Sequence, residues 1–356
     1  MARRSRTLWI VLLLGGAGVA LYIAFGAGDK VGHRATTDTA PADGAGNVAG
    51  NGGRGEMPRP ATAPGATQSA PADKVAAKEL FDRGMALLAE KNDDRLIKAR
   101  QDLSDAYFSG SLAPELEDQA RRRLEELADR TIFAAAWMDG DPYSDRYVVK
   151  PRDSLQKIEQ AQRLHVPAEL LAKVNNVDPG KLQEGRAIKL IRGPFNAVVY
   201  KSRFAMDVYL QRDDYPRVFV RRFQVGLGRN GSTPLGFWHV RLGRTARPKT
   251  DTEPAQGSIS GKLRQARFDP PPGSEATQSI AYGESGYPFG KMGLFIPLEG
   301  DDENTGRMVN YGIHSTNDPD SIGKEGSLGC IRLKDDDIEM VYMLLYEKWS
   351  KVETRP

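Results

Sequence analysis

Hydrophobic and polar positions follow several different periods along the chain, and each change of period marks a change of structure. Residues 7–28 carry no charge, and the apolar run within them is long enough at ~1.5 Å per residue to cross a hydrocarbon core of ~30 Å. Arg3, Arg4 and Arg6 precede the run, which predicts that the amino terminus stays in the cytoplasm. No clear Ala-x-Ala cleavage site follows it. We therefore expect residues 1–28 to form an uncleaved transmembrane anchor.

The periodicity disappears over residues 29–75. Gly, Ala, Pro, Thr, Ser and Asn dominate there, and large apolar residues are few. Such a composition cannot bury enough surface to offset the entropy of the chain. We expect a disordered linker, which as a flexible coil of roughly 45 residues would reach about 35 to 40 Å.

A helical period returns over residues 76–140. The apolar stripe comprises Ala77, Leu80, Phe81, Met85, Leu87 and Leu88, continued by Leu103, Ala106, Tyr107, Leu124, Leu127 and Ile132. Gly110-Ser111 breaks the pattern, and Pro114 suits the first turn of a new helix. The segment resembles a tetratricopeptide-like helical hairpin, although a self-supporting stack needs ~3 repeats. We expect two or three antiparallel helices that act as a spacer or dock a protein partner.

Residues 145–192 predict two short strands that flank two helices. Asp153 and Ser154 are candidate helix caps, and the apolar positions Leu155, Ile158, Leu170, Leu171 and Val174 form the expected core. The segment resembles the LysM domain at Tyr147–Lys150, Asp153–Leu155, Asn175 and Leu182–Gly185, with Arg152 where that family prefers Gly. The resemblance implies a small α+β domain that binds glycan containing N-acetylglucosamine. His165 needs no binding role.

Strand-like alternation dominates residues 194–356. Val198, Tyr200, Met206, Val208 and Leu210 alternate with other positions as in a half-buried strand. Near the carboxyl end, Ile338, Val341, Tyr342, Leu345 and Trp349 recur at helical spacing, and we expect Asp335 or Asp336 to cap that helix. The insert 244–290, rich in Pro and Gly, is too long for an ordinary turn. It is either a lid over a cleft or a disordered surface loop.

The charge of the chain adds little to the prediction of its function. The chain has 50 basic and 47 acidic residues and a formal net charge of +3, with no basic block apart from the amino terminus. Nucleic-acid binding therefore has no support. The run Arg121–Arg123 is interpreted as a solvated helix face.

Cys330 is the single cysteine of the chain, so it cannot form a disulfide or a four-ligand metal cage within its own chain. Two roles remain, namely a nucleophile or an inert core residue. His314 lies sixteen positions earlier and could take the thiol proton and return it to a leaving amine. The carbonyl or hydroxyl of Ser315 could fix the imidazole tautomer. The N–H groups of Gly329 and Cys330 could bind an oxyanion.

The segment from His314 to Arg332 resembles the catalytic motif of the L,D-transpeptidases of the YkuD type. The matching residues are His314, Ser315, Ser327, Gly329, Cys330, Ile331 and Arg332, and the upstream Ser232–Trp238 segment resembles the family's hairpin. The resemblance covers residues 194–352 and implies a mainly-β sandwich with a C-terminal helix. Leu328 departs from the pattern, because the family usually has a second histidine there. That histidine lines the site but does not activate the sulfur.

The resemblance implies a cysteine-dependent acyl transfer on peptidoglycan stem peptides with no cofactor and no metal. Cys330 would attack the third residue's carbonyl and expel D-alanine, and an amine of a neighbouring stem would form a 3-3 cross-link. Tyr311, Ser327 and Arg332 are candidate substrate-binding residues. For Arg332, a position on an outward strand face slightly favours the alternative role of bracing its loop. The predicted location is the bacterial cell envelope, anchored in the inner membrane with the other domains in the periplasm.

Three alternatives stay open. With water as acceptor, the protein would be an L,D-carboxypeptidase. With the chemistry lost through Leu328, it would be a LysM scaffold that binds the wall. A sortase-like transpeptidase is disfavoured, because that signature places an arginine well downstream of the cysteine and includes no LysM domain.

Overall fold

The computed structural model describes residues 71–90, 92–212, 215–243, 261–270, 278–308 and 310–356, all within one compact unit, Pro64–Pro356. The predicted anchor, residues 1–28, and the linker up to residue 70 lie outside the described residues. Among the residues that are described, no helix is both long enough and apolar enough to cross a membrane. The insert 244–290 is described only at residues 261–270 and 278–290.

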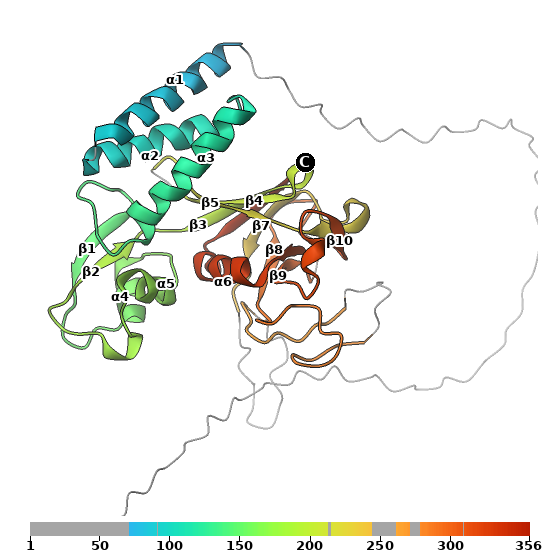
Figure 1. Cartoon of the computed structure of the whole chain (residues 1–356). Coiled ribbons are helices and arrows are strands. Elements are labelled where there is room, and N and C mark those ends of the chain that lie inside the picture. The colour runs from blue at the N-terminus through green and yellow to red at the C-terminus, as the bar shows by residue number, and fades with distance from the viewer. Residues whose placement is uncertain (1–70, 91, 213–214, 244–260, 271–277, 309) are drawn as a thin grey trace, which may run out of the picture. The chain divides into compact units, whose positions relative to one another are not determined.

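Three helices form the amino-terminal part of this unit (Figure 1). They are α1 (Pro71–Leu87), α2 (Asp93–Phe108) and α3 (Pro114–Ala128). Asn92 caps α2 by accepting a hydrogen bond from the N–H of Asp94 at 2.9 Å, and Pro114 begins α3. The predicted apolar stripe is largely buried, with Leu103, Ala106 and Leu124 fully enclosed. The expectation of two or three helices is confirmed.

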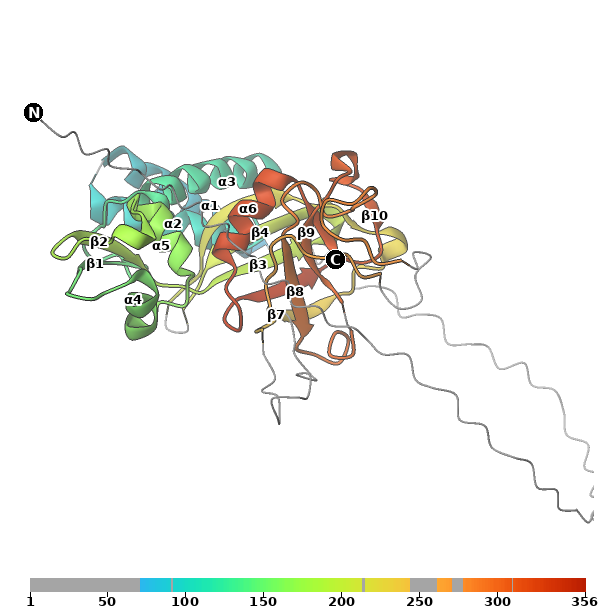
Figure 2. The ribbon, with the colours of Figure 1, turned by 90° about the horizontal axis from the view of Figure 1, so that it is seen from below.

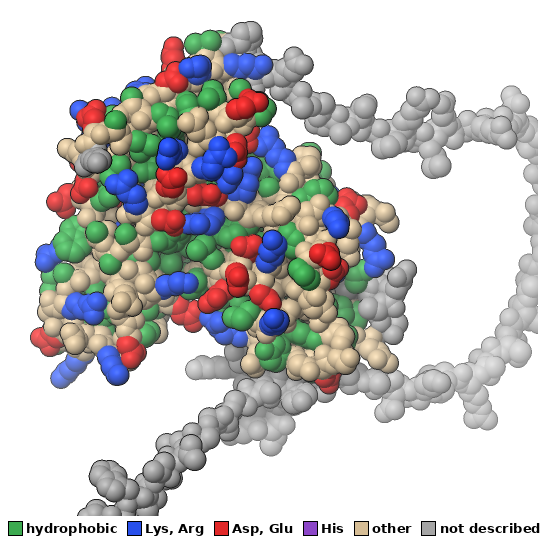
Figure 3. Space-filling view, viewed as in Figure 1, with side chains coloured by type: hydrophobic (Ala, Val, Ile, Leu, Met, Phe, Trp, Pro, Cys, Tyr) green, Lys and Arg blue, Asp and Glu red, His purple; other side chains and the backbone are tan. Residues whose placement is uncertain are grey.

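The opposite face of α3 is charged, as expected for Arg121–Arg123. Arg121 pairs with Asp118 at 2.6 Å and with Glu125 at 3.1 Å, and Arg123 pairs with Glu126 at 2.8 Å. Figure 3 shows basic and acidic side chains intermixed over this part of the surface. Exposed pairs of this kind contribute little to stability, because water and salt screen both charges.

The second part has the β-α-α-β order that was expected. It consists of β1 (Ser144–Val148), α4 (Leu155–Gln162), α5 (Ala168–Asn175) and β2 (Ala187–Ile191), with β1 and β2 antiparallel. Ser154 caps α4 by accepting from the N–H of Lys157 at 3.3 Å. Asn175 is buried and joins α5 to β2, because its amide donates to the carbonyls of Leu171 and Lys189. A structural function therefore accounts for Asn175.

The third part is a mainly-β sandwich around an eight-stranded sheet with the order β11-β9-β8-β7-β12-β3-β4-β5 (Figures 1 and 2). Its strands are β3 (Phe195–Tyr200), β4 (Ala205–Leu210), β5 (Val218–Gln224), β7 (Gly236–Val240), β8 (Phe295–Gly300), β9 (Gly312–Ser315), β11 (Ile331–Leu333) and β12 (Lys351–Arg355). A separate parallel pair joins β6 (Leu227–Gly228) to β10 (Glu325–Ser327). The expected fold class is confirmed.

Short helical turns join these elements. They are Leu88–Glu90, Asp129–Phe133, Pro179–Lys181, Lys201–Arg203, Arg229–Gly231 and Pro319–Ser321.

Helices cover the sheet at two places. The helices α2 and α3 pack on β5, where Phe219 enters the helical core, while α6 (Asp335–Leu344) packs near β9. Strands β3 and β4 are buried along almost their whole length. Asp207 of β4 is fully buried, and it accepts from the Tyr107 hydroxyl at 2.7 Å and from two nitrogens of Arg222 at 2.7 and 3.0 Å.

The carboxyl-terminal helix corrects two expectations. Asp335 and Asp336 lie in the first turn of α6 rather than at its cap, which is Lys334 with no side-chain hydrogen bond. Trp349 was expected on the helix, but α6 ends at Leu344 because the chain turns there to enter β12. Trp349 is instead 37% exposed, and its ring stacks on His165 with centroids 3.6 Å apart. His165 therefore packs against Trp349, which agrees with the expectation that it has no binding role.

Candidate active site

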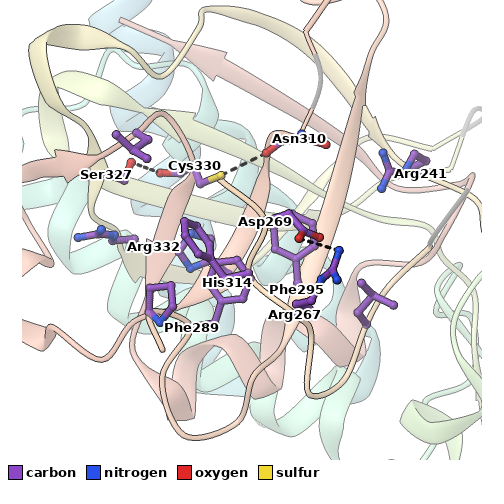
Figure 4. Close-up of a pocket in the computed structure, with 14 residues that line it drawn as sticks. Arg241, Arg267, Asp269, Phe289, Phe295, Asn310, His314, Ser327, Cys330 and Arg332 are labelled. Atoms are coloured by element: carbon purple, nitrogen blue, oxygen red, sulfur yellow. Dashed lines mark hydrogen bonds and ion pairs between the residues drawn. The ribbon is translucent and has the colours of Figure 1, made fainter. Parts of the chain in front are cut away.

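Parallel pairing of two short strands brings Cys330 and His314 to the same face of the sheet. In the register of β9 with β11, Arg332 is opposite His314 and Ile331 is opposite Ile313. Side chains alternate between the two faces along a strand, so Cys330, Arg332 and His314 all point to one side. Figure 4 shows the thiol and the imidazole at one cleft.

This cleft has a volume of about 170 Å³ and is formed by elements far apart in the sequence. Its lining residues are Arg241, Leu263, Arg267, Phe268, Asp269, Pro288, Phe289, Phe295, Asn310, His314, Ser327, Leu328, Cys330 and Arg332. The sulfur is therefore not sealed in an apolar core, and Cys330 keeps part of its surface exposed. An inert role as core filler does not fit this position.

His314 is held in one orientation. Its Nδ1 lies 2.5 Å from the carbonyl oxygen of Ser315, and because a carbonyl only accepts, Nδ1 is the donor. The other ring nitrogen, Nε2, is then left as the proton acceptor. The imidazole is 4% exposed and packs against the ring of Phe289, with centroids 4.3 Å apart. Ser315 thus meets the imidazole through its carbonyl, while its hydroxyl donates to the carbonyl of Phe289.

The pKa values of both groups favour their neutral forms. Burial lowers the pKa of His314 to about 4, opposed by its hydrogen bond to Ser315 and assisted by the positive charge of Arg332. Burial raises the pKa of the Cys330 thiol to about 11, opposed by a backbone hydrogen bond with Gly312 and by Arg332. The thiol lies 3.6 Å from the carbonyl oxygen of Asn310, toward which it donates. The site therefore rests as a thiol and a neutral imidazole.

Ser327 and Gly329 form the turn that presents the sulfur. The Ser327 hydroxyl donates to the Cys330 carbonyl at 2.6 Å and accepts from the Gly329 N–H at 3.1 Å. The Gly329 N–H, one of the two oxyanion donors that the sequence suggested, is therefore already engaged. Gly329 has a φ of +131°, and an added Cβ would lie 2.6 Å from the Tyr311 ring, so only glycine fits there.

The other candidate residues lie at different distances from the cleft. Tyr311 is not among its lining residues; its ring packs against Gly329 and lies 5.6 Å from that of Trp238. Arg332 does line the cleft, is partly buried, and has an Nε with no hydrogen-bond partner among the described residues. Leu328, in place of the family's second histidine, also lines the cleft.

Sequence reasoning missed much of the cleft wall. Arg241, Asn310 and Phe295 come from strand ends and loops, whereas Arg267, Phe268 and Asp269 come from the insert. The only signal for the latter group was the length of the insert, which suggested a lid. No spacing rule identifies which insert residues face the sulfur.

Comparison with known families agrees with the geometry. Residues 196–353 match the model of the L,D-transpeptidase catalytic domain, YkuD, and residues 147–190 match that of the LysM domain. Residues 196–353 are therefore similar to the L,D-transpeptidase catalytic domain. This transpeptidase domain holds the whole cleft, and the LysM domain is the β-α-α-β part. No curated protein matches the sequence.

Several solved structures are similar to the chain. Bd1075 of Bdellovibrio bacteriovorus is 12% identical with a TM-score of 0.28; the match covers 45% of this chain and 47%, about half, of that protein. An L,D-transpeptidase from Mycobacterium smegmatis is 10% identical with a TM-score of 0.29, covering 64% of this chain and 100% of its own. An L,D-transpeptidase from Stackebrandtia nassauensis is 16% identical with a TM-score of 0.25, covering 66% and 90%.

Proposed function

We propose that the protein is a peptidoglycan L,D-transpeptidase in which Cys330 is the nucleophile and His314 the general base. One observation carries the proposal: both side chains line the same cleft, and the Ser315 carbonyl holds His314 with Nε2 as the acceptor. The family match supports the same class of enzyme.

In the first half-reaction, His314 Nε2 takes the thiol proton and the sulfur attacks the carbonyl carbon of the donor's third residue. The tetrahedral intermediate then collapses, the carbon–nitrogen bond to D-alanine breaks, and the departing amine receives the proton from His314. A thioester on Cys330 and free D-alanine are the products. Because the Gly329 N–H donates to Ser327, oxyanion binding falls to other donors at the cleft, and we propose the Cys330 N–H as one of them.

In the second half-reaction, an amine of a neighbouring stem attacks the thioester. A new amide bond forms, the carbon–sulfur bond breaks, and the thiol regains a proton. With a diaminopimelate side chain as the acceptor, the product is a 3-3 cross-link. With water instead, the same site would act as a carboxypeptidase.

The LysM domain would hold the enzyme on its polymer. Its fold is complete, with the two-stranded sheet and both helices in place, which supports binding of glycan that contains N-acetylglucosamine. These two domains suggest a cell-envelope protein. Anchoring in the inner membrane stays a proposal that rests on the apolar run within residues 1–28, outside the described residues. Docking of a protein partner by the helices also stays a proposal.

A scaffold without catalysis is the second candidate, and Leu328 favours it. A leucine at the cleft cannot donate a hydrogen bond or share a proton with the neutral thiol. If the chemistry has been lost, the LysM domain would supply all useful contacts with the wall.

Muropeptide analysis separates these functions. Purified full-length protein and its Cys330→Ala variant are incubated with disaccharide-tetrapeptide, and the products are separated and weighed. We expect cross-linked dimers and free D-alanine with the wild type and neither with the variant. Tripeptide without dimers would indicate a carboxypeptidase, and no product from either protein, with retained binding to the wall, would indicate the scaffold. Dimers from both would rule out Cys330 as the nucleophile.

Reaction with a carbapenem gives an independent readout, because the L,D-transpeptidases that the sequence resembles are typically sensitive to this class. The β-lactam carbonyl is an electrophile that traps an activated sulfur as an acyl-enzyme. We expect one adduct on Cys330 by mass spectrometry. Absence of an adduct together with absence of dimers would support the scaffold.

A further inference from the structure

The described part of the insert is a folded wall of the cleft. Ala266, Tyr287 and Phe289 form a small buried cluster, and the backbones of Phe268 and Ile280 pair through hydrogen bonds of 2.9 and 3.0 Å. Lys262 fixes the insert to the end of α6, because its ammonium donates to the carbonyls of Tyr342 at 2.5 Å and Leu345 at 2.8 Å. The side chains that the insert presents to the cleft are therefore held in place.

The charges of the cleft are unbalanced. Arg241, Arg267 and Arg332 line it, whereas Asp269 is the one carboxylate among its described lining residues. Figure 4 shows Arg332 on one side of Cys330 and His314, and Arg241 and Arg267 on the other. An extended ligand that crosses the sulfur would meet a cation in either direction, which favours a substrate with carboxylates on both sides of the reacting carbonyl.

Arg267 already binds a carboxylate that a ligand can replace. Its guanidinium lies 2.8 Å from Asp269, and the two side chains are 51% and 50% exposed. An ion pair as exposed as this is weak, because water competes for both partners. A ligand carboxylate that arrives from the cleft can take the place of Asp269 on the same guanidinium.

Arg332 and Arg267 lie at different places in the cleft, so we expect each to bind a different carboxylate of the donor peptide. Arg332 is partly buried and close enough to Cys330 to change the pKa of its thiol, so it is placed for a group a few bonds from the reacting carbonyl, such as the terminal carboxylate of D-alanine. Arg267 comes from the insert at the more exposed rim. It is placed for a carboxylate at the end of a longer side chain.

We propose that Arg267 is a specificity-determining residue that binds the side-chain carboxylate of the donor's third residue, in exchange for Asp269. The proposal rests on the proposed function for the identity of the donor. A donor whose third residue is diaminopimelate with a free carboxylate would be preferred over the same donor with that group amidated. Arg267 acts in binding and not in the chemical step.

The test measures affinity, so that it does not depend on turnover. Full-length Cys330→Ala protein is titrated by calorimetry with two tetrapeptides, one carrying the free diaminopimelate carboxylate and one carrying its amide. We expect the acid to bind about tenfold more tightly, since a charge-assisted hydrogen bond of this kind is lost with the amide. Adding Arg267→Gln should reduce the acid-to-amide ratio to about one.

Two further variants separate recognition from loop structure. Arg264→Gln makes the same change in the same insert, but Arg264 pairs with Glu169 at 2.9 Å and does not line the cleft, so the ratio should stay near tenfold. Asp269→Asn removes the competing carboxylate, so it should tighten binding of the acid about two- to threefold. If the Arg267–Asp269 pair merely braced the insert, Arg267→Gln and Asp269→Asn would each weaken binding of the acid and of the amide tetrapeptide by the same factor.

The outcomes distinguish this inference from the proposed function. An acid-to-amide ratio that Arg267→Gln leaves unchanged, or no binding of either tetrapeptide, would overturn the inference. An acid-to-amide ratio that falls to about one in Arg267→Gln but stays near tenfold in Arg264→Gln would support the inference, even if the wild-type protein formed no cross-links. Cross-linking by the wild type with an unchanged ratio would leave the proposed function standing and remove Arg267 from it.

Discussion

At Cys330 and His314, burial keeps the thiol and the imidazole neutral. The pKa of the thiol is raised to about 11 and that of the imidazole is lowered to about 4, so a thiolate–imidazolium pair is disfavoured. A bound donor would change this balance by supplying an electrophile to the sulfur as its proton leaves. The Cys330 thiol is therefore expected to resist unspecific alkylation and oxidation.

Alkylation by iodoacetamide tests the raised pKa of the thiol. Cys330 is the single cysteine, so total labelling reports on it alone. Only the thiolate reacts, so the labelling rate should keep increasing with pH toward a midpoint near 11. A cysteine-containing peptide, which titrates near ~8.5, is the control. A rate that reaches its plateau at the same pH as the peptide would contradict the burial argument.

The lowered pKa of His314 predicts that activity falls only at unusually low pH. The base must be neutral to accept the thiol proton, and with a pKa of about 4 it stays neutral well below the ordinary value of 6.5. kcat/KM for release of D-alanine should therefore persist to about pH 5 and fall as the pH approaches 4. His314→Gln should remove this limb together with most of the activity. A fall centred near pH 6.5 would show that the imidazole titrates as if exposed.

Leu328→His tests the departure from the family pattern. The new imidazole would stand at the cleft beside the thiol and restore a titratable group and a hydrogen-bond donor. We expect a new inflection near pH ~6.5 in the rate profile and faster acylation, with Leu328→Gln as the uncharged control. If both variants show the wild-type profile, position 328 does not influence the chemistry.

Sequence and structure agree best where the motif is local. The spacing from His314 to Cys330 could be interpreted because the two strands that carry them pair directly. The same strands place Arg332 opposite His314. Arg267 and Arg241 could not be found in this way, because both are far from Cys330 in the sequence. The fold of the insert brings Arg267 to the cleft, and Arg241 reaches it from the end of β7.

At the level of elements, the helices are coupled to the transpeptidase sheet through buried charge. Asp207 of β4 accepts from Tyr107 of α2 and from Arg222 of β5, and it is fully buried. Burial, with Asp207 close by, raises the pKa of the Tyr107 hydroxyl, so that it stays a donor at any physiological pH. The hydrophobic pattern predicted the helices but not this contact, because nothing in a helix period specifies which strand it meets.

Asp207→Ala should destabilise the protein by about 3 to 5 kcal/mol, because it leaves the Arg222 charge buried without its partner. Urea unfolding followed by circular dichroism measures the change. Asp118→Ala is the control, since Asp118 is 45% exposed and pairs with arginines on the surface of α3, so its effect should be much smaller than that of Asp207→Ala. Equal effects of the two variants would show that the buried network does not hold the helices.

Over the whole described unit, the LysM and transpeptidase domains share one hydrophobic core. A single buried cluster includes Leu164 and Val166 of the LysM domain together with Phe195 and Leu345 of the transpeptidase domain. The Gly193 N–H also donates to the Leu164 carbonyl at 2.8 Å. Composition and spacing identified the two domains separately. They could not predict that the segment between the domains packs against the LysM domain instead of forming a flexible linker.

This shared core predicts cooperative unfolding. Because the two domains bury apolar surface against each other, differential scanning calorimetry of the full chain should give one main transition. Val166→Ala should lower the midpoint of that transition as a whole, with an expected loss of about 1 to 3 kcal/mol. Two separate transitions, with only the smaller one moved by the variant, would mean that the domains fold independently.

We propose that Cys330 becomes acylated by a stem peptide with His314 as the base. Intact-mass spectrometry of the full-length protein, quenched in acid within seconds of mixing with a tetrapeptide donor, measures this directly. We predict a mass increase equal to the tripeptide acyl group on Cys330, its loss on addition of hydroxylamine, and at least a hundredfold slower formation in His314→Gln. An unmodified wild-type protein that nevertheless releases D-alanine, or an adduct retained in Cys330→Ala, would contradict the account.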